Sequence, residues 1–451
     1  MKRVDLRIIP AWSFLVMALA RGQAPSLSAT QDQTTLRITT HLVQVNVVVW
    51  DKQREPVGDL KREDFVVLDE GGEQRISLFS VESSQRTTSP PEPLPPGTFS
   101  NRLEYRPGTP TSVTVILLDG LNTNFGDQVY AKQQIVKFLK QLQPQDRVAL
   151  YALGSNLRVL HDFTSDAQTL LNALARYGGR ISGELEASEP TTSVSDTPEP
   201  DRSNLGVVNP AERGGRMQEL DAWLRESNRQ VEEFYTAKRA GETLRALEAI
   251  ASHLAQLPGR KNLVWVSGSF PYWIGFDFLP TPGNPGRVSR SFSPEIERAS
   301  RLLNNANLAV YPVDARGLTG LPEFSAQQRF APNRRLQTLN LGIDTMNALA
   351  DRTGGRAFYN TNDLQGAIRH AIDDSRVTYM LGYYPTHDKW DGKFRKIKVQ
   401  VKRAGLRVRH RQGYFAVPEE APNPGQQENA LALAAWSPLD ATAVRMTVRA
   451  T

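Results

Sequence analysis

Asp119 and Thr123 are the residues whose types and spacing come closest to a chemical site. They lie in the polar loop DGLNTN at residues 119–124, directly after the run VTVILL at 113–118. Such a run is typical of a strand buried on both faces of a parallel sheet, and loops at the carboxyl ends of these strands hold the ligand sites of open α/β sheets. We therefore expect Asp119 to lie where chemistry would occur. The alternative is that Asp119 caps the loop and Thr123 bonds to the backbone.

The sequence lacks other catalytic arrangements. Its six histidines include no H-E-x-x-H pair, Ser267 is not in a G-x-S-x-G elbow, and there is neither a Walker loop nor a G-x-G-x-x-G fingerprint. Asp373 and Asp374 are neighbours in an expected helix, so they do not face each other as a carboxylate pair. We therefore predict that the protein is not an enzyme.

The elements that position Asp119 belong to a region of alternating strands and helices at residues 111–376. Further strands of this region are expected at 147–154, 157–163, 262–266 and 308–313. Segments with helical periodicity separate most of them, and this alternation predicts an α/β fold with a doubly wound, mainly parallel sheet. Residues 177–230 have no steady apolar period, so we expect a flexible insertion there.

Strand patterns of period two flank this region on both sides. Residues 34–82 are expected to form a small β-sandwich-like module, with a hairpin at 65–79 that bends at Gly71 and Gly72. A linker rich in Pro and Ser follows at 83–110. Residues 377–416 are expected to form a β-hairpin extension with one basic face, which we interpret as solvated charge. The tail at 417–451 is expected to be loosely ordered.

Residues 1–22 are expected to be a secretory signal peptide. They combine a basic start, an apolar segment too short to span a bilayer, and small residues at Ala18 and Ala20 that suit cleavage. The competing interpretation is an uncleaved membrane anchor, but Pro10 interrupts the apolar run. We expect a secreted or periplasmic mature chain without a transmembrane segment.

Composition restricts the chemistry and the partners. The chain has 451 residues and no cysteine, which excludes disulfides, thiolate catalysis and zinc sites built from cysteine. The formal net charge is +6. An exported chain seldom meets nucleic acid, so we expect a protein or a cell-envelope polymer as the partner.

The order of these features resembles the von Willebrand factor type A-related proteins exported by acidobacteria and similar soil bacteria. The resemblance covers nearly the whole mature chain and rests on the strand before Asp119, the loop ending in Thr123, the following βα units, and the segment from GYY at 382–384 to DGKFRKIKVQV at 391–401. It implies a doubly wound sheet with a site at its top. Family members that retain the full motif bind a divalent cation there, through a D-x-S-x-S loop, a Thr from a second loop and an Asp after the fourth strand. Mg²⁺ suits such oxygen ligands.

This sequence departs from that metal-binding pattern. Asp119 and Thr123 match the first and fifth loop positions, but Leu121 stands at the third, where the family has a hydroxyl. Ser267 replaces the fourth-strand Asp, and Arg180 replaces the Thr of the second loop, where an inward-pointing Arg180 would put a cation in place of the metal. Two ligands rarely hold Mg²⁺ against its reluctance to dehydrate. We expect a degenerate site with no cofactor, or at most weakly bound Mg²⁺. Asp314, at the end of the next strand, is a further neighbour on the rim.

The sequence therefore predicts an exported, non-enzymatic binding or adhesion module. Two alternatives stay open. One is a metal-dependent hydrolase that uses the rim carboxylates Asp119 and Asp314, and the other is a structural component of the cell envelope.

Overall fold

The structure is a computed structural model. The residues it describes are 41–83, 94–100, 112–188, 210–255, 257, 259–268, 293–318, 332–387, 389–417, 428, 439 and 447–449. The expected signal peptide at 1–22 lies outside them.

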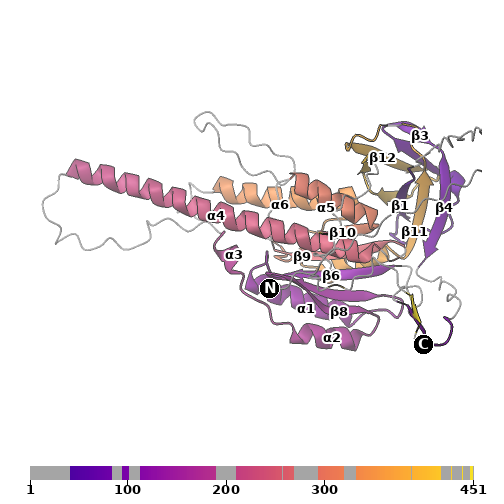
Figure 1. The fold of residues 1–451 in the computed structure, drawn as a ribbon, viewed down its shortest axis with the longest axis horizontal. Coiled ribbons are helices and arrows are strands. Elements are labelled where there is room, and N and C mark those ends of the chain that lie inside the picture. Colours follow the sequence, from indigo (N-terminus) through magenta and orange to yellow (C-terminus); the bar gives the residue numbers. More distant parts are fainter. Residues whose placement is uncertain are drawn as a thin grey trace, which may run out of the picture. The chain divides into compact units, whose positions relative to one another are not determined.

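A five-stranded sheet forms the centre of the α/β region, with the strand order β10-β9-β6-β7-β8 (Figure 1). Its strands are β6 (Val113–Asp119), β7 (Val148–Leu153), β8 (Leu157–Thr164), β9 (Lys261–Ser267) and β10 (Leu308–Asp314). Only β8 runs antiparallel to its neighbour in this sheet. The four parallel strands are buried along their whole length, which explains why their sequences do not alternate. The expected doubly wound, mainly parallel sheet is confirmed.

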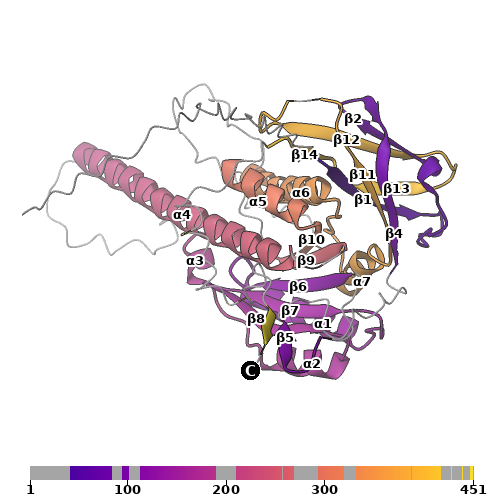
Figure 2. The same cartoon turned by 45° about the vertical axis from the view of Figure 1, so that its right-hand side comes forward.

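Helices cover both faces of this sheet (Figures 1 and 2). They are α1 (Phe125–Leu139), α2 (Ala167–Arg176), α3 (Gly183–Glu186), α4 (Pro210–Leu254), α5 (Ser293–Asn305), α6 (Pro332–Thr353) and α7 (Leu364–Asp373). Val115 and Leu117 of β6 pack with apolar residues of α4, α5 and α6. Ile116 and Leu118 pack with α1, α2 and α7. Successive side chains of one strand thus supply the two separate cores.

Helix α4 corrects the expectation of an irregular segment up to residue 230. It begins at Pro210 and runs for 45 residues, so residues 210–229 are helical. The short helix α3 also falls within the expected insertion. Most residues at 210–229 have good or tolerable helix propensity, and Met217, Leu220 and Leu224 recur at helical spacing, but Pro210 and the pair Gly214 and Gly215 obscure this pattern. Residues 189–209 of the expected insertion lie outside the described residues.

Two four-stranded sheets form a β-sandwich from both ends of the chain. Their orders are β13-β1-β11-β4 and β14-β12-β2-β3. The strands are β1 (Val43–Trp50), β2 (Phe65–Asp69), β3 (Gly72–Gln74), β4 (Ile76–Ser83), β11 (Val377–Tyr383), β12 (Phe394–Val401), β13 (Arg407–His410) and β14 (Gly413–Phe415), with a 3₁₀ turn at Arg62–Asp64. Val47 of β1 lies opposite Tyr379 of β11 on one side and His410 of β13 on the other. The segments that the sequence presents as an N-terminal module and a C-terminal extension thus share one core.

The structure corrects the β-hairpin expected within residues 377–416, because its two basic strands do not pair with each other. The hairpin that bends at Gly71 is present as β2 and β3. β12 and β13 follow each other through a turn, but β12 pairs with β2 and β14, whereas β13 pairs with β1. Their alternation is that of half-buried strands, and alternation alone does not reveal which strand is the partner.

The expected linker and tail also contain ordered structure. Strand β5 (Thr98–Ser100) of the linker pairs with β15 (Thr447–Arg449) of the tail. Leu439 of the tail is buried in the core shared with α4, α5 and α6. In the described part of the chain, no helix has both the length and the apolar character needed to cross a membrane.

Candidate functional site

Asp119 ends the central strand β6 and is almost completely buried, with 2% of its surface exposed. Its Oδ1 accepts hydrogen bonds from the backbone N–H of Asn122 at 3.0 Å and from Asn122 Nδ2 at 3.1 Å. Its Oδ2 accepts from Asn122 Nδ2, from Trp265 Nε1 and from Ser267 Oγ, each at 2.9 Å. Burial raises the pKa of Asp119 above its usual value, and these hydrogen bonds act in the opposite direction. The carboxylate is therefore engaged by protein donors on both oxygens.

Asn122 connects this carboxylate to a buried cation on helix α4. Its Nδ2 also donates to Thr243 Oγ1 at 2.8 Å, and its Oδ1 accepts from Arg239 Nη1 at 2.8 Å. Arg239 is 6% exposed and Thr243 is fully buried. Arg239 and Thr243 are one helical turn apart, and the Thr243 hydroxyl donates to the Arg239 carbonyl. A negative and a positive side chain are thus linked through one carboxamide.

Thr123 and Leu121 take no part in this carboxylate network. Thr123 is 2% exposed, and its Oγ1 accepts the backbone N–H of Gly268 at 2.8 Å. A Cβ on Gly268 would lie 3.2 Å from Thr123 Cα, so this close approach favours glycine. Leu121 is buried in the core with helix α4. The third loop position, which would carry a ligand hydroxyl in the resembled family, therefore serves packing.

Gln128 of α1 connects the loop after β6 to the second loop, which contains Arg180. Its Nε2 donates to the carbonyls of Thr123 at 2.6 Å, Arg180 at 2.8 Å and Gly120 at 3.3 Å. Its Oε1 accepts the backbone N–H of Arg180 at 3.2 Å. The side chain of Arg180 itself is exposed. The cation beside Asn122 is therefore Arg239, and the idea of an inward-pointing Arg180 is wrong.

Asp314 and Ser267 lie opposite each other at the ends of β10 and β9. Ser267 contacts Asp119, as described above. Asp314 is 2% exposed and forms a two-pronged ion pair with Arg316, through Nε at 2.9 Å and Nη2 at 2.7 Å. Each of its oxygens therefore accepts a charged donor. The structure brings Asp119 and Ser267 together but gives Asp314 a different partner.

This donor set does not suit a divalent cation. Mg²⁺ requires several oxygen ligands whose lone pairs point at the ion. The oxygens of Asp119 accept five hydrogen bonds, and the Asn122 oxygen faces a guanidinium group. Within the described ranges, no group of three or more His, Asp or Glu residues has a geometry that would hold a metal ion.

Sequence reasoning missed four residues of this site: Trp265, Arg239, Thr243 and Gln128. Trp265 lies in the expected strand at 262–266, where its apolar side chain indicates a core residue rather than a site residue. Arg239 lies shortly after the insertion expected at 177–230, so the sequence pattern did not show that it belongs to a long helix. Residues four apart share one face of a helix, so the spacing of Arg239 and Thr243 could have placed them side by side. That inference requires the knowledge that both residues belong to α4.

No protein-family model matches the chain, and no curated protein matches its sequence. Solved structures similar to it include an aerotolerance-related membrane protein from Bacteroides fragilis, with 13% identity, 58% of this chain and 98% of that chain covered, and a TM-score of 0.29. Another is the SpRpn10 VWA domain, with 14% identity, 58% and 93% covered, and a TM-score of 0.25. A third is proximal thread matrix protein 1 from the mussel byssus with a zinc-occupied MIDAS motif, with 11% identity, 62% and 48% covered, and a TM-score of 0.25.

Proposed function

We propose that this protein is an exported, non-enzymatic binding module of the type A kind, whose metal site is degenerate and whose partner is a protein. The observation that carries the proposal is the closed network of Asp119, Asn122 and Arg239 at the carboxyl edge, the edge of the five-stranded sheet where its parallel strands end.

The guanidinium group of Arg239 takes over the electrostatic role of the cation. A buried carboxylate needs a compensating positive charge, and a guanidinium group stays charged at any ordinary pH. The carboxamide of Asn122 connects the two side chains, since it donates to Asp119 and accepts from Arg239. This arrangement fastens α4 to the loop after β6 without an ion. Binding by this module should therefore not depend on divalent cations.

Exposed apolar side chains at the same edge support a protein partner. Phe125, directly after the site loop, is 49% exposed, and Ile181 of the second loop is 67% exposed. Leu318, four residues after the end of β10, is 61% exposed. Gly179 of the second loop lies against the Phe125 ring. Large apolar side chains gathered around one edge are typical of protein interaction sites.

The network weighs against the hydrolase alternative. Asp119 and Asp314 would have to bind a metal or move a proton, but both accept hydrogen bonds from fixed protein donors. A structural role in the envelope is the second alternative, and it is an outcome of the experiment below.

The proposal is tested by cross-linking the purified chain to proteins of the cell envelope, with and without EDTA. We compare the wild type with a Phe125→Ser, Ile181→Ser double variant. The expected result is a discrete cross-linked partner that persists in EDTA and is lost with the double variant, because the variant removes apolar contact area at the carboxyl edge.

Val417→Ser is the matched control, since Val417 is 41% exposed but lies beyond β14 of the sandwich. It should retain the partner, and all variants should keep the wild-type melting temperature to within a few degrees. A partner released by EDTA would contradict the degenerate site. Identical cross-linking by all variants would favour the structural role.

A further inference from the structure

The first half of helix α4 extends beyond the carboxyl edge of the five-stranded sheet (Figures 1 and 2). Arg239 and Thr243 contact Asn122 of the loop at that edge. Of the α4 side chains that the structure describes, those that pack in the core of the α/β domain begin at Ala237. Residues 210–236, which we call the arm, precede this contact, and a helix of that length measures roughly 40 Å.

Large apolar side chains are exposed on the arm. Trp223 is 64% exposed, Phe234 63% and Val231 46%, and Leu224 is partly exposed beside Trp223. Because an α-helix has 3.6 residues per turn, these four side chains fall within a sector of roughly 100° around its axis. They therefore form one stripe along the arm. An exposed apolar stripe on a helix is typical of a surface that another element covers.

The stripe does not continue the face by which the second half of α4 packs on the sheet. Leu247 and Leu254 are fully buried in the core, and helical rotation places them roughly 150° around the axis from Val231. On the side of Val231, the second half of α4 carries the exposed residues Lys238 and Arg245, at successive intervals of seven residues. The apolar stripe therefore ends where α4 reaches its own domain, and it is directed away from that domain.

The spacing of the stripe fits another helix. Its positions follow steps of three and four residues, as positions a and d of a coiled coil do. They are Met217, Leu220, Leu224, Ser227, Val231 and Phe234. A seam that repeats every 3.5 residues is the pattern that two helices bury between them, and Trp223 would cover one side of it. None of the six is charged, so burial of the seam requires no ion pair.

We propose that the arm binds the arm of a second copy of this chain in antiparallel orientation, so that the protein is a two-fold symmetric dimer. The seam is its own complement in this orientation, because reversal places each position a opposite a position d. The facing pairs would be Phe234 with Met217, Val231 with Leu220, and Leu224 with Ser227. Self-complementarity is the requirement of a two-fold interface.

The antiparallel orientation also distributes the side-chain volumes evenly. It places the small Ser227 opposite a leucine, and the large Phe234 opposite an unbranched methionine. A parallel copy would instead place Ser227 on Ser227 and Phe234 on Phe234, which is a poorly filled layer close to a crowded one. Because each arm joins its domain near Ala237, antiparallel pairing would put the two α/β domains at opposite ends of the pair, where they do not collide.

The exposed apolar area is sufficient to start such an interface. A buried aromatic side chain removes roughly 150–250 Å² from water. Trp223 and Phe234 are each about three-fifths exposed, so the four rings of two copies would bury roughly 500 Å². Specific interfaces bury roughly 1,200–2,000 Å² in total, so the rings would supply about a third of that area. The aliphatic positions of the seam and the stems of the flanking polar side chains would supply the rest.

The test is sedimentation velocity of the full chain over a range of concentrations. The wild type should sediment as a dimer at micromolar concentrations and above. Val231→Glu should raise the dimer dissociation constant by about a hundredfold or more, because it buries an unpaired carboxylate twice in the seam. Val129→Glu is the matched control, since Val129 of α1 is 42% exposed, close to the 46% of Val231, but lies outside the arm. It should leave the dissociation constant unchanged.

Cross-linking tests the orientation, because the chain has no cysteine of its own. Leu220→Cys and Val231→Cys should be linked by a short bifunctional maleimide when the two variants are mixed and left to exchange. Neither variant should be linked to itself, since the two copies of one such position would lie roughly 16 Å apart along the axis of an antiparallel pair. The proposal is overturned if the wild type stays monomeric at about 0.1 mM or if Val231→Glu leaves the dimer intact. It is also overturned if either cysteine variant is cross-linked on its own.

Discussion

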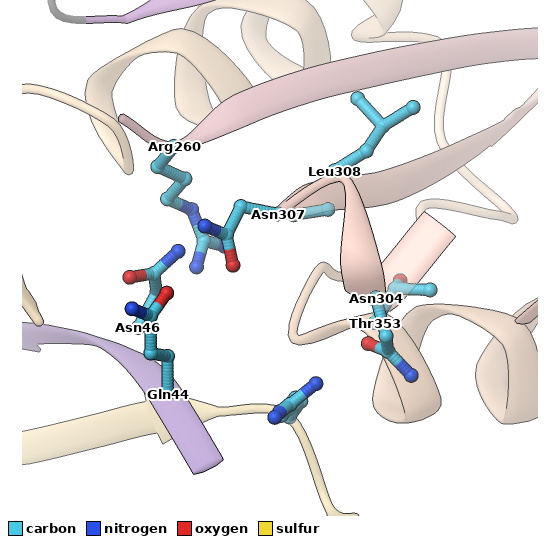
Figure 3. Close-up of a pocket in the computed structure, with 9 residues that line it drawn as sticks. Gln44, Asn46, Arg260, Asn304, Asn307, Leu308 and Thr353 are labelled. Atoms are coloured by element: carbon cyan, nitrogen blue, oxygen red, sulfur yellow. The ribbon is translucent and has the colours of Figure 1, made fainter. Parts of the chain in front are cut away.

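Two buried arginines at opposite edges of the same sheet have very different surroundings. Arg239 at the carboxyl edge donates to Asn122, which also holds the carboxylate of Asp119. Arg260 at the amino edge, where the parallel strands begin (Figure 3), donates to the Tyr311 hydroxyl and to the Gly354 carbonyl, and the Tyr311 hydroxyl in turn donates to Asp374. The first cation reaches the Asp119 carboxylate through the carboxamide of Asn122, whereas the carboxylate that Arg260 reaches through a hydroxyl group is also in direct contact with Arg409. The two edges of one sheet therefore compensate their buried arginines in different ways.

The largest effect is expected from breaking the closed network with Asn122→Leu. This change removes the group that bonds both Asp119 and Arg239, so two buried charges lose their shared partner. We expect a loss of about 3–5 kcal/mol in the free energy of unfolding. Urea unfolding followed by circular dichroism measures it. Asn228→Leu on the exposed face of α4 is the control and should change stability by less than about 0.5 kcal/mol. A comparably small loss for Asn122→Leu would mean that the network does not hold the edge together.

The amino edge is tested through Lys261, which follows Arg260 and is 2% exposed. Burial lowers the pKa of Lys261 to about 8 in the folded protein, although Glu82 opposes this. In the unfolded chain its pKa is about 10.4. Between these values the unfolded state binds more protons, so this residue makes stability rise as the pH increases from about 8 to about 10.

Lys261→Met should therefore remove a pH-dependent part of the stability, worth up to about 3 kcal/mol. The measurement is the difference in unfolding free energy between wild type and variant at about pH 7 and about pH 9.5. Lys398→Met, at an exposed position of β12, should leave the pH dependence unchanged. A difference that does not vary with pH would show that the cations of the amino edge are fully compensated.

A smaller effect is expected from Gln128→Ala, which removes the side chain that holds the two loops of the carboxyl edge. Carbonyls of Gly120, Thr123 and Arg180 would lose their donor, at a cost of about 1–3 kcal/mol. Thermal unfolding measures it, with Gln133→Ala at an exposed position of α1 as the control. If both variants melt at the same temperature, the loops do not depend on Gln128.

The smallest effect is expected from magnesium. Because the oxygens at Asp119 and Asn122 are engaged, millimolar Mg²⁺ should leave the melting temperature within about 1 °C of its value in sodium chloride of equal ionic strength. A larger increase that disappears in Asp119→Ala would contradict the degenerate site, and Arg239 would then have to move when the metal binds.

Local patterns in the sequence were sufficient for the central α/β fold. The apolar run before Asp119 and the alternation of strands with helices both follow from burial on two faces of a parallel sheet, which is a property of each segment alone. The sandwich was only half predictable. The alternation in β1 and β12 shows half-buried strands, but β1 pairs with β11, more than 300 residues away, and no local pattern encodes such a partner.

The candidate site, like the fold, was only partly predictable from the sequence. The sequence by itself placed Asp119, Thr123 and Ser267 at one edge, and the family resemblance implied that Leu121 stands where a ligand hydroxyl would be. Only the tertiary structure decided that Arg239, not Arg180, is the cation beside Asn122, because Arg239 lies 117 residues from Asn122 on a separate helix. The contacts of Arg260 at the amino edge belong wholly to the tertiary structure. Its partners Tyr311 and Gly354 lie 51 and 94 residues away in the chain, and no spacing in the sequence predicts such contacts.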